Sequence, residues 1–284
     1  MKSNSKILTV VAAITIFFAS CDTSIGCIGY TGFEWQIDES GGVIITAFVG
    51  RGGSVEIPAE IEGLAVTAIG AVAFWDRQLT RVTIPDGVTS IGHSAFMHNR
   101  MTSIIIPENV TYIGERAVAL TQLTSVSIPE SITVIEDGLF RNNHLTSVNI
   151  PSNITLIWPL TFSYNQLTNI NIPSSVTLIG WGAFAHNHLT HINIPNSVTS
   201  IQGEAFAFNQ LTYVDIPDSV TSIGVRAFFG NQLTSIVIGA NVELLTLYGH
   251  VPFGYGFEAA YEANGRAAGR YTRPNTESTA WSRS

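Results

Sequence analysis

The sequence is poor in charged residues and in cysteine. Only 12% of its 284 residues are charged, which is about half the fraction of an average soluble domain, so uncharged Ser, Thr, Asn and Gln must cover much of the surface. The two cysteines, Cys21 and Cys27, cannot form a disulfide framework across a chain of this length. We therefore expect a packed apolar core, rather than cross-links, to hold the fold together.

Basic residues are also scarce. The chain has 13 Lys and Arg against 21 Asp and Glu, a formal net charge of -8, and its basic residues are not clustered. Affinity for nucleic acid comes largely from basic side chains that neutralise phosphates. The sequence therefore predicts no nucleic-acid partner.

Motifs of catalysis and cofactor binding are missing as well. The sequence contains no G-x-S-x-G, H-E-x-x-H or P-loop motif. Residues 254–259 fit the G-x-G-x-x-A pattern of dinucleotide sites, but nothing before them predicts the βαβ unit that this pattern requires. His186, His188 and His191 would converge on a metal ion only by chance. We predict no catalytic residue, metal ligand or cofactor, and keep a secreted enzyme or a metal-binding protein as distant alternatives.

The N-terminus has the layout of a secretory signal. Lys2 and Lys6 precede an apolar run at residues 7–18, which is too short to span a bilayer. Cleavage after Ser20 by the ordinary signal peptidase would place the bulky Phe18 where that enzyme requires a small residue. A different peptidase is therefore expected.

The sequence Phe-Ala-Ser-Cys at residues 18–21 resembles the lipobox of bacterial lipoproteins, although Leu is usual at its first position. The resemblance implies a signal peptide at residues 1–20, an acylated Cys21 as the mature N-terminus, and a tether at residues 21–31. Two or more acyl chains give stable anchoring in a membrane. The expected location is the bacterial envelope, lipid-anchored at the cell surface, with simple secretion and an uncleaved anchor as alternatives.

From residue 79 onward the chain repeats with a fixed period of 22 residues. The unit reads L-T-x-V-x-I-P-x-S-V-T-x-I-G-x-x-A-F-x-x-N-Q. Without gap or insertion, its first position is occupied by Leu79, Met101, Leu123, Leu145, Leu167, Leu189, Leu211 and Leu233. Such regularity indicates that the fixed positions build the core.

Each unit predicts one short strand. Apolar residues at positions four and six alternate with variable, mostly polar ones, as in a half-buried strand, and proline at position seven, from Pro85 to Pro217, must end it because proline cannot donate to a ladder. Apolar residues at positions ten, thirteen and eighteen, as in Val176, Ile179 and Phe184, suit a turn and a short helix or 3₁₀ segment. One unit buries too little apolar surface to fold alone, so the units must stack, with a strand side and a helical side.

The unit resembles the BspA-like, Treponema-type leucine-rich repeats over about residues 54–247, most clearly at residues 167–184 and 211–228. The resemblance implies an α/β, strand-dominated leucine-rich-repeat solenoid, wound as a right-handed coil of 22-residue units with N- and C-terminal caps. Members of this family are bacterial surface or secreted proteins, many regarded as adhesins. The family has no catalytic residues to transfer.

The solenoid is expected to occupy residues 32–247. Within it, residues 32–53 are predicted to form a strand-bearing N-terminal cap, and residues 54–74 an irregular first unit. Residues 248–284 are predicted to form a C-terminal cap segment with a short helix at residues 258–263.

Function is expected where the repeat leaves residues free to vary. Positions three and five, which we call the strand-side row, face outward from the predicted strands; a recognition face and an unselected solvent face would both show this freedom. The candidate ligand-binding residues in the row are Asn169, Asn171, His191, Asn193, Tyr213 and Asp215. A second candidate surface is formed by aromatic residues on the other side of the later units: Trp158, Tyr164, Trp181, Phe208 and Phe229.

The leading hypothesis is an adhesin-like protein that binds a protein or glycan partner through the strand-side row and contacts the membrane through Cys21. The sequence does not name the partner or the oligomeric state. The alternative is a structural envelope protein that self-associates through its edges or its aromatic side.

Overall fold

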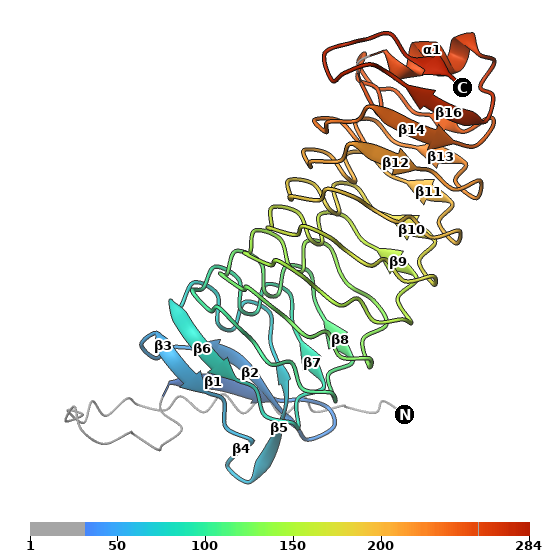
Figure 1. Cartoon of the computed structure of the whole chain (residues 1–284). Helices are drawn as coiled ribbons and strands as arrows, with labels where there is room; N and C mark the ends of the chain where they lie inside the picture. Colours follow the sequence, from blue (N-terminus) through green and yellow to red (C-terminus); the bar gives the residue numbers. More distant parts are fainter. Residues whose placement is uncertain (1–31, 255) are drawn as a thin grey trace, which may run out of the picture. The chain divides into compact units, whose positions relative to one another are not determined.

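The computed structural model describes residues 32–254 and 256–284. In residues 32–284, which form one compact unit, the 22-residue units are coils stacked in sequence order (Figure 1). The secondary structure of the described residues consists of strands β1 to β17 and a single helix, α1 (Phe257–Ala263). The predicted strand-dominated solenoid is therefore confirmed, while the signal peptide, the tether, Cys21 and Cys27 lie outside the described residues.

The first coils carry the longest strands. β1 (Phe33–Ile37) pairs antiparallel with β2 (Val43–Phe48), which pairs in parallel with β5 (Leu64–Ile69). β4 (Glu60–Ile61) pairs antiparallel with β5, so the extra residues of the irregular first unit form a small hairpin. The sheet of the solenoid thus begins inside the segment predicted as the N-terminal cap.

The strands predicted before the proline are present at the two ends of the stack. β3 (Gly53–Glu56) pairs in parallel with β6 (Leu79–Thr83), and β12 (Tyr213–Asp215) with β14 (Ser235–Ile238). Between these pairs the pairing is reduced to single bridges, such as the one between Asn171 and Asn193. The proline carbonyl then accepts a hydrogen bond from the amide three residues later, as Val176 donates to Pro173 at 3.1 Å, so the strand ends in a turn.

A second ladder runs along the coils at positions twelve and thirteen, where the sequence predicted a turn or a short helix. Its members are two-residue strands, most of them 22 residues apart: β7 (Ser90–Ile91), β8 (Tyr112–Ile113), β9 (Leu156–Ile157), β10 (Leu178–Ile179), β11 (Ser200–Ile201), β13 (Ser222–Ile223) and β15 (Glu243–Leu244). They pair in parallel, Ile179 with Ile157 and Ile201 for example. The prediction of a single strand per unit, ending at the proline, was therefore wrong: three repeat units carry two strands each, and between residues 101 and 210 the strands lie at positions twelve and thirteen instead.

The third side of each coil is built from turns, not from the predicted helix or 3₁₀ segment. Two residues per coil, such as Arg116 (φ 55°) and Leu120 (φ 52°), adopt the left-handed conformation, which interrupts a right-handed helix. Amides on this side alternate between two acceptors. Phe184 donates to Ala205 of the next coil at 2.8 Å, and Ala185 donates to Gly182 of its own coil at 3.1 Å. We call this face the turn side.

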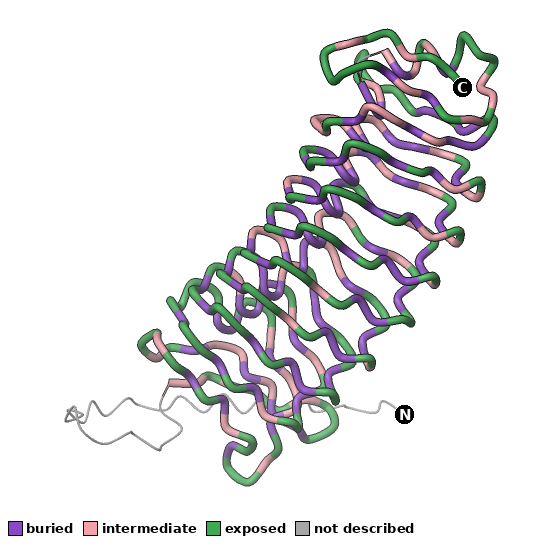
Figure 2. Tube along the Cα trace, in the orientation of Figure 1, coloured by how far each residue is buried: buried purple, intermediate pink, exposed green. Residues whose placement is uncertain are grey.

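The core is a set of columns of buried side chains that run through the stack, and Figure 2 shows buried segments recurring from coil to coil. One column holds the phenylalanines of position eighteen. Phe162, Phe184 and Phe206 are fully buried and stack nearly parallel, with ring centroids 5.5 and 5.4 Å apart. Each coil therefore covers the open face of its neighbour, as the stacking argument requires.

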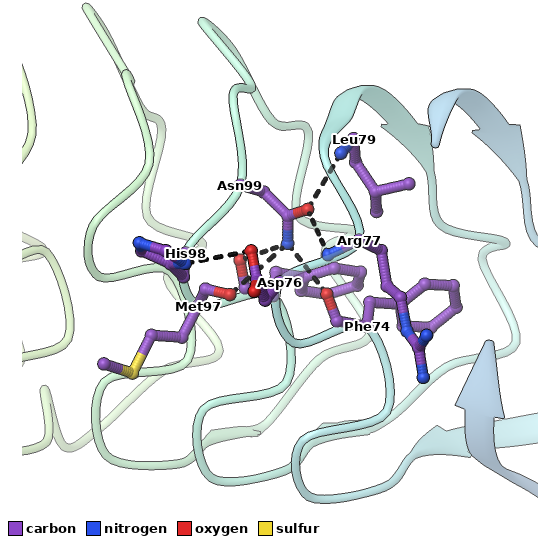
Figure 3. Close-up of polar contacts among 8 residues, drawn as sticks. Phe74, Asp76, Arg77, Leu79, Met97, His98 and Asn99 are labelled. Atoms are coloured by element: carbon purple, nitrogen blue, oxygen red, sulfur yellow. Dashed lines mark hydrogen bonds and ion pairs between the residues drawn. The ribbon is translucent and has the colours of Figure 1, made fainter. Parts of the chain in front are cut away.

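A column of asparagines at position twenty-one, all buried except the half-buried Asn231, satisfies backbone groups that the turns leave unpaired. In Figure 3, the Asn99 side-chain oxygen accepts from the amides of Arg77 (3.2 Å) and Leu79 (2.8 Å), and its amide nitrogen donates to the carbonyls of Phe74 and Phe96, both at 2.8 Å. The same pattern of contacts recurs at Asn143, Asn165, Asn187, Asn209 and Asn231. We call these residues the asparagine column.

The C-terminal segment packs on the last coil. Phe253 stacks on Phe228 at 5.0 Å and 4°, and Phe257 and Tyr261 of α1 are fully buried. The predicted helix is thus present. β16 (Gly269–Thr272) pairs antiparallel with β14 and with β17 (Ser282–Arg283).

The G-x-G-x-x-A run at the start of this segment forms a bend. Gly254 and Gly256 have φ of 77° and 83°, and Gly256 is the N-cap residue of α1. The carboxylate of Glu258, in the first turn, accepts hydrogen bonds from the amides of Phe253 and Gly254. The glycines therefore serve the turn into the helix.

Candidate functional site

The strand-side row brings the six predicted binding residues onto three neighbouring coils. Asn169, Asn171, His191, Asn193, Tyr213 and Asp215 are all exposed. The residues between them, such as Ile170, Ile192 and Val214, point into the core. The alternation predicted for a half-buried strand therefore holds here, even where the strand is reduced to a bridge.

The six residues are polar, with Asp215 as the one carboxylate among them, and two hollows in the described surface lie elsewhere. One, of about 350 Å³, is lined by Trp181 and Gln202 among others. The other, of about 240 Å³, is lined by Arg116 and Arg141 among others. A surface of this kind offers hydrogen-bonding groups over an area rather than a cavity for a small molecule.

One end of the row is fixed by a cluster around Tyr213. The Tyr213 hydroxyl donates to a carboxylate oxygen of Asp215 at 3.0 Å, and the guanidinium carbon of Arg270 lies 5.4 Å from the centroid of the Tyr213 ring. Arg270 also donates to the Ser235 hydroxyl at 3.1 Å. Partial burial, with the hydrogen bond and negative charge of Asp215, raises the pKa of Tyr213. The phenol is therefore held in its neutral, donating form.

Arg270 was not among the residues predicted from the sequence. It lies outside the repeat, on β16, and reaches the row because β16 pairs antiparallel with β14, opposite Val237. Nothing in the 22-residue pattern signals this pairing. The only sequence signal is that Arg270 precedes two residues with a preference for strands, Tyr271 and Thr272.

The three neighbouring histidines do not form one cluster. His191 lies in the strand-side row, and His186 lies in an aromatic stack on the turn side. His188 is 3.5 Å from the Gln210 side chain. Within residues 32–254 and 256–284 no group of three His, Cys, Asp or Glu is placed to hold a metal ion.

The aromatic residues of the turn side form a ladder in which the rings cover one another. His186 stacks between Tyr164 and Phe208, with centroids 4.2 and 4.5 Å apart, and Phe208 meets Phe229 edge to face at 5.6 Å. Arg141 lies over the outer side of this ladder at Tyr164, 5.7 Å from the centroid. We call these four rings the aromatic ladder; their faces are occupied by neighbours, so mainly their edges meet solvent.

Burial in the ladder has an electrostatic consequence for His186. Desolvation lowers its pKa, and the negative charge of Glu204 opposes the shift only in part. The ring is therefore neutral at pH 7, as stacking between two aromatic rings favours. Trp158 and Trp181 are not in the ladder and remain about two-fifths exposed, at 41% and 42%.

No helix within the described part of the chain is long and apolar enough to cross a membrane.

The structure is similar to several solved bacterial leucine-rich-repeat proteins. A leucine rich cell surface protein from Faecalibacterium prausnitzii A2-165 shares 25% identity over 78% of this chain and 56% of its own, with a TM-score of 0.48. A leucine-rich repeat protein from Bacteroides ovatus ATCC 8483 shares 22% over 76% and 66%, with a TM-score of 0.47. The leucine rich repeat protein of T. pallidum shares 22% over 71% and 87%, with a TM-score of 0.45. The chain thus spans less than two thirds of the first two proteins.

No protein of curated function matches the sequence. Residues 54–166 and 139–248 match the family described as "BspA type Leucine rich repeat region (6 copies)". The repeat that defines the family is the one that builds the coils above, so the chain belongs to the BspA-type leucine-rich-repeat family.

Proposed function

We propose that the chain is an envelope-anchored bacterial surface protein that binds a partner protein through the strand-side row. The observation that carries this proposal is the exposure of the six candidate side chains: Asn169, Asn171, His191, Asn193, Tyr213 and Asp215. They occupy successive coils at positions that the core does not constrain. Strands on neighbouring coils lie about 4.8 Å apart, so these side chains line up at a spacing that an extended partner surface can follow.

The chemistry of the row favours recognition by hydrogen bonds. Asn side chains offer both donors and acceptors, and Tyr is among the residues enriched at the energetic centres of interfaces. Tyr213 is already oriented by Asp215 and Arg270, so little conformational entropy is lost when a partner contacts it. We place the centre of the binding surface at this residue.

The binding experiment uses residues 28–284 on a panel of purified extracellular-matrix proteins. We expect saturable binding to at least one panel member, weakened by about tenfold or more in a variant carrying Tyr213→Ala and Asp215→Ala, as for loss of an interface centre. A matched control carries Tyr248→Ala and Asp86→Ala, two exposed residues of the same types outside the row. Equal binding by both double variants refutes the site. The same protein is also applied to a glycan array, and binding to the array without binding to any protein of the panel identifies the partner as a glycan instead of a protein.

The anchor is proposed from the lipobox-like residues 18–21. Acylation of Cys21 would display the solenoid at the membrane surface through two or more acyl chains. Cells that express the full chain and are fed an alkyne-labelled fatty acid should incorporate the label, and Cys21→Ala should abolish it. Label retained in Cys21→Ala but lost in Cys27→Ala contradicts the assignment.

Self-association is the second candidate function, because an exposed apolar group lies near the end of the stack. Leu245, Leu247 and Tyr248 are exposed, Tyr248 to 91%. Sedimentation of residues 28–284 at increasing concentration separates the two functions. A monomer over the whole range favours the partner-binding protein, and polymers that grow with concentration favour the structural one.

A further inference from the structure

A hollow on the turn side, distinct from the strand-side row, is lined by two arginines. It has a volume of about 240 Å³, spans three successive coils, and is formed by Met97, Arg116, Ala119, Leu120, Arg141 and Asn142. Its walls are therefore partly apolar, and both of its positive charges are guanidinium groups.

Atoms of both arginines lie close to Gly138. A Cβ atom placed on Gly138 would lie 3.2 Å from Cγ and 3.7 Å from Nε of Arg116, and 3.8 Å from Cβ of Arg141. Arg116 thus extends across the next coil at the position where that coil has no side chain, and Arg141 belongs to that same coil, three residues after Gly138. Arg141 in turn extends toward Tyr164 of the following coil, 5.7 Å from its centroid.

Among the described residues, no carboxylate oxygen lies within 4.0 Å of either guanidinium. The ion pairs of the described residues involve other side chains, and the Nε atoms of Arg116 and Arg141 are buried without a hydrogen-bond acceptor. Both residues are only partly exposed, so water replaces the missing partners less fully than it does for an arginine on the open surface. A partly buried positive charge without an anionic partner is costly and favours binding of an anion.

Arg226 provides an internal comparison, because it occupies the same position of its unit as Arg116 and has nearly the same φ, 56° against 55°. Its Nε is also buried without an acceptor. Its terminal nitrogens, however, lie 3.9 Å from a Glu204 carboxylate oxygen and 2.9 to 3.0 Å from the ring nitrogens of His250. The residues above and below Arg116 in that column are Gly138 and Ser94, which supply no charge.

We propose that the hollow binds an acidic sugar unit, a saccharide ring that carries a sulfate or a carboxylate. The planar guanidinium matches the oxygens of either anion. The Asn142 side chain adds hydrogen-bonding capacity, and Met97 and Leu120 offer apolar contacts to the ring. The volume is below the usual 300 to 1,000 Å³ of sites for drug-sized ligands, so one sugar ring, not an extended peptide, fits. This site is independent of the strand-side row.

Calorimetric titration of the full-length chain, in an uncharged detergent, tests the site. The probes are galactose 6-sulfate, N-acetylneuraminic acid, uncharged galactose and inorganic sulfate. We expect binding of at least one charged sugar, with affinity at least about tenfold above that of both galactose and inorganic sulfate. The charged probe that binds identifies the anion as sulfate or carboxylate. Equal binding of inorganic sulfate, which indicates an adventitious ion only, or no binding of either charged sugar, overturns the proposal.

Variants connect the binding to these residues. Arg116→Gln and Arg141→Gln should each lower the affinity for the charged sugar by about tenfold. Arg226→Gln, the matched control, should leave this affinity unchanged. Arg116→Lys keeps the positive charge but not the planar guanidinium, and should lower the affinity by an intermediate factor. A graded loss of this kind indicates direct contact with the ligand and not misfolding. Unchanged affinity in both Arg116→Gln and Arg141→Gln, or an equal loss in Arg226→Gln, overturns the site.

Discussion

The asparagine column gives the sharpest prediction about stability. Replacing Asn187 with Ala removes the acceptor for the Leu167 amide (3.0 Å) and the donor to the carbonyls of Phe162 (2.9 Å) and Phe184 (3.1 Å). Asn187 is buried in the stack, so water cannot readily replace these bonds. An unsatisfied buried group costs about 1–3 kcal/mol; with three groups affected and some relaxation, we expect a loss of about 3–6 kcal/mol in the free energy of unfolding.

Urea unfolding followed by far-ultraviolet circular dichroism measures this loss through the midpoint and the slope of the transition. The matched control is Asn193→Ala, which removes the same side chain from the exposed strand-side row and should change the free energy of unfolding by no more than about 0.5 kcal/mol. If Asn187→Ala costs no more than Asn193→Ala, the asparagine column does not stabilise the stack and the reasoning is refuted.

Three further predictions concern single side chains. Thr121 stands in the column where other units have Asn, so Thr121→Asn should raise the free energy of unfolding by about 1 kcal/mol, and a lowered urea midpoint would contradict this. Because the folded-state pKa of His186 is lowered, protonation favours the unfolded chain and acidification below about pH 6.5 removes stability; His186→Phe should flatten this pH dependence of the melting temperature, and an unchanged slope would contradict it. The Tyr261 hydroxyl donates to Gly239 and accepts from Val242 in the core, so Tyr261→Phe should cost about 2 kcal/mol in urea unfolding, whereas the exposed Tyr248→Phe should cost nothing.

The sequence predicted the parts of the fold that have a clear period. The alternating apolar residues at positions four and six predicted the strand side, and the following proline predicted where the strand ends because it has no N–H to donate. Both signals can be read from residue types and their spacing. The second ladder at Ile157, Ile179 and Ile201 was missed because a two-residue strand shows only one buried residue per unit. That signal is the same for a strand and for a turn.

The turn side was predicted as helical because its left-handed residues carry ordinary side chains. Positive φ is expected of Gly and Asn, whereas Arg116 and Leu120 give no such signal. The hydrogen bonds between coils that stabilise this conformation exist only once the units stack. The aromatic side chains of the turn side were identified from the sequence, but their stacking on one another depends on the same register between coils.

The candidate site was predictable only in its placement. Exposure of Asn171, His191 and Tyr213 followed from their positions in the unit, which the structure bears out. The contact of Arg270 with Tyr213 depends on the path of the C-terminal segment, which no repeat specifies. Whether these residues bind a partner stays a prediction.

Hydroxyl-radical footprinting of residues 28–284, with and without the partner found in the panel, tests the central claim most directly. Each face carries reactive, exposed side chains: His191 and Tyr213 in the strand-side row, Trp158 and Trp181 outside it. We predict that the partner protects His191 and Tyr213 from oxidation and leaves Trp158 and Trp181 unchanged. Protection of the two tryptophans without protection of Tyr213 would contradict binding through the strand-side row.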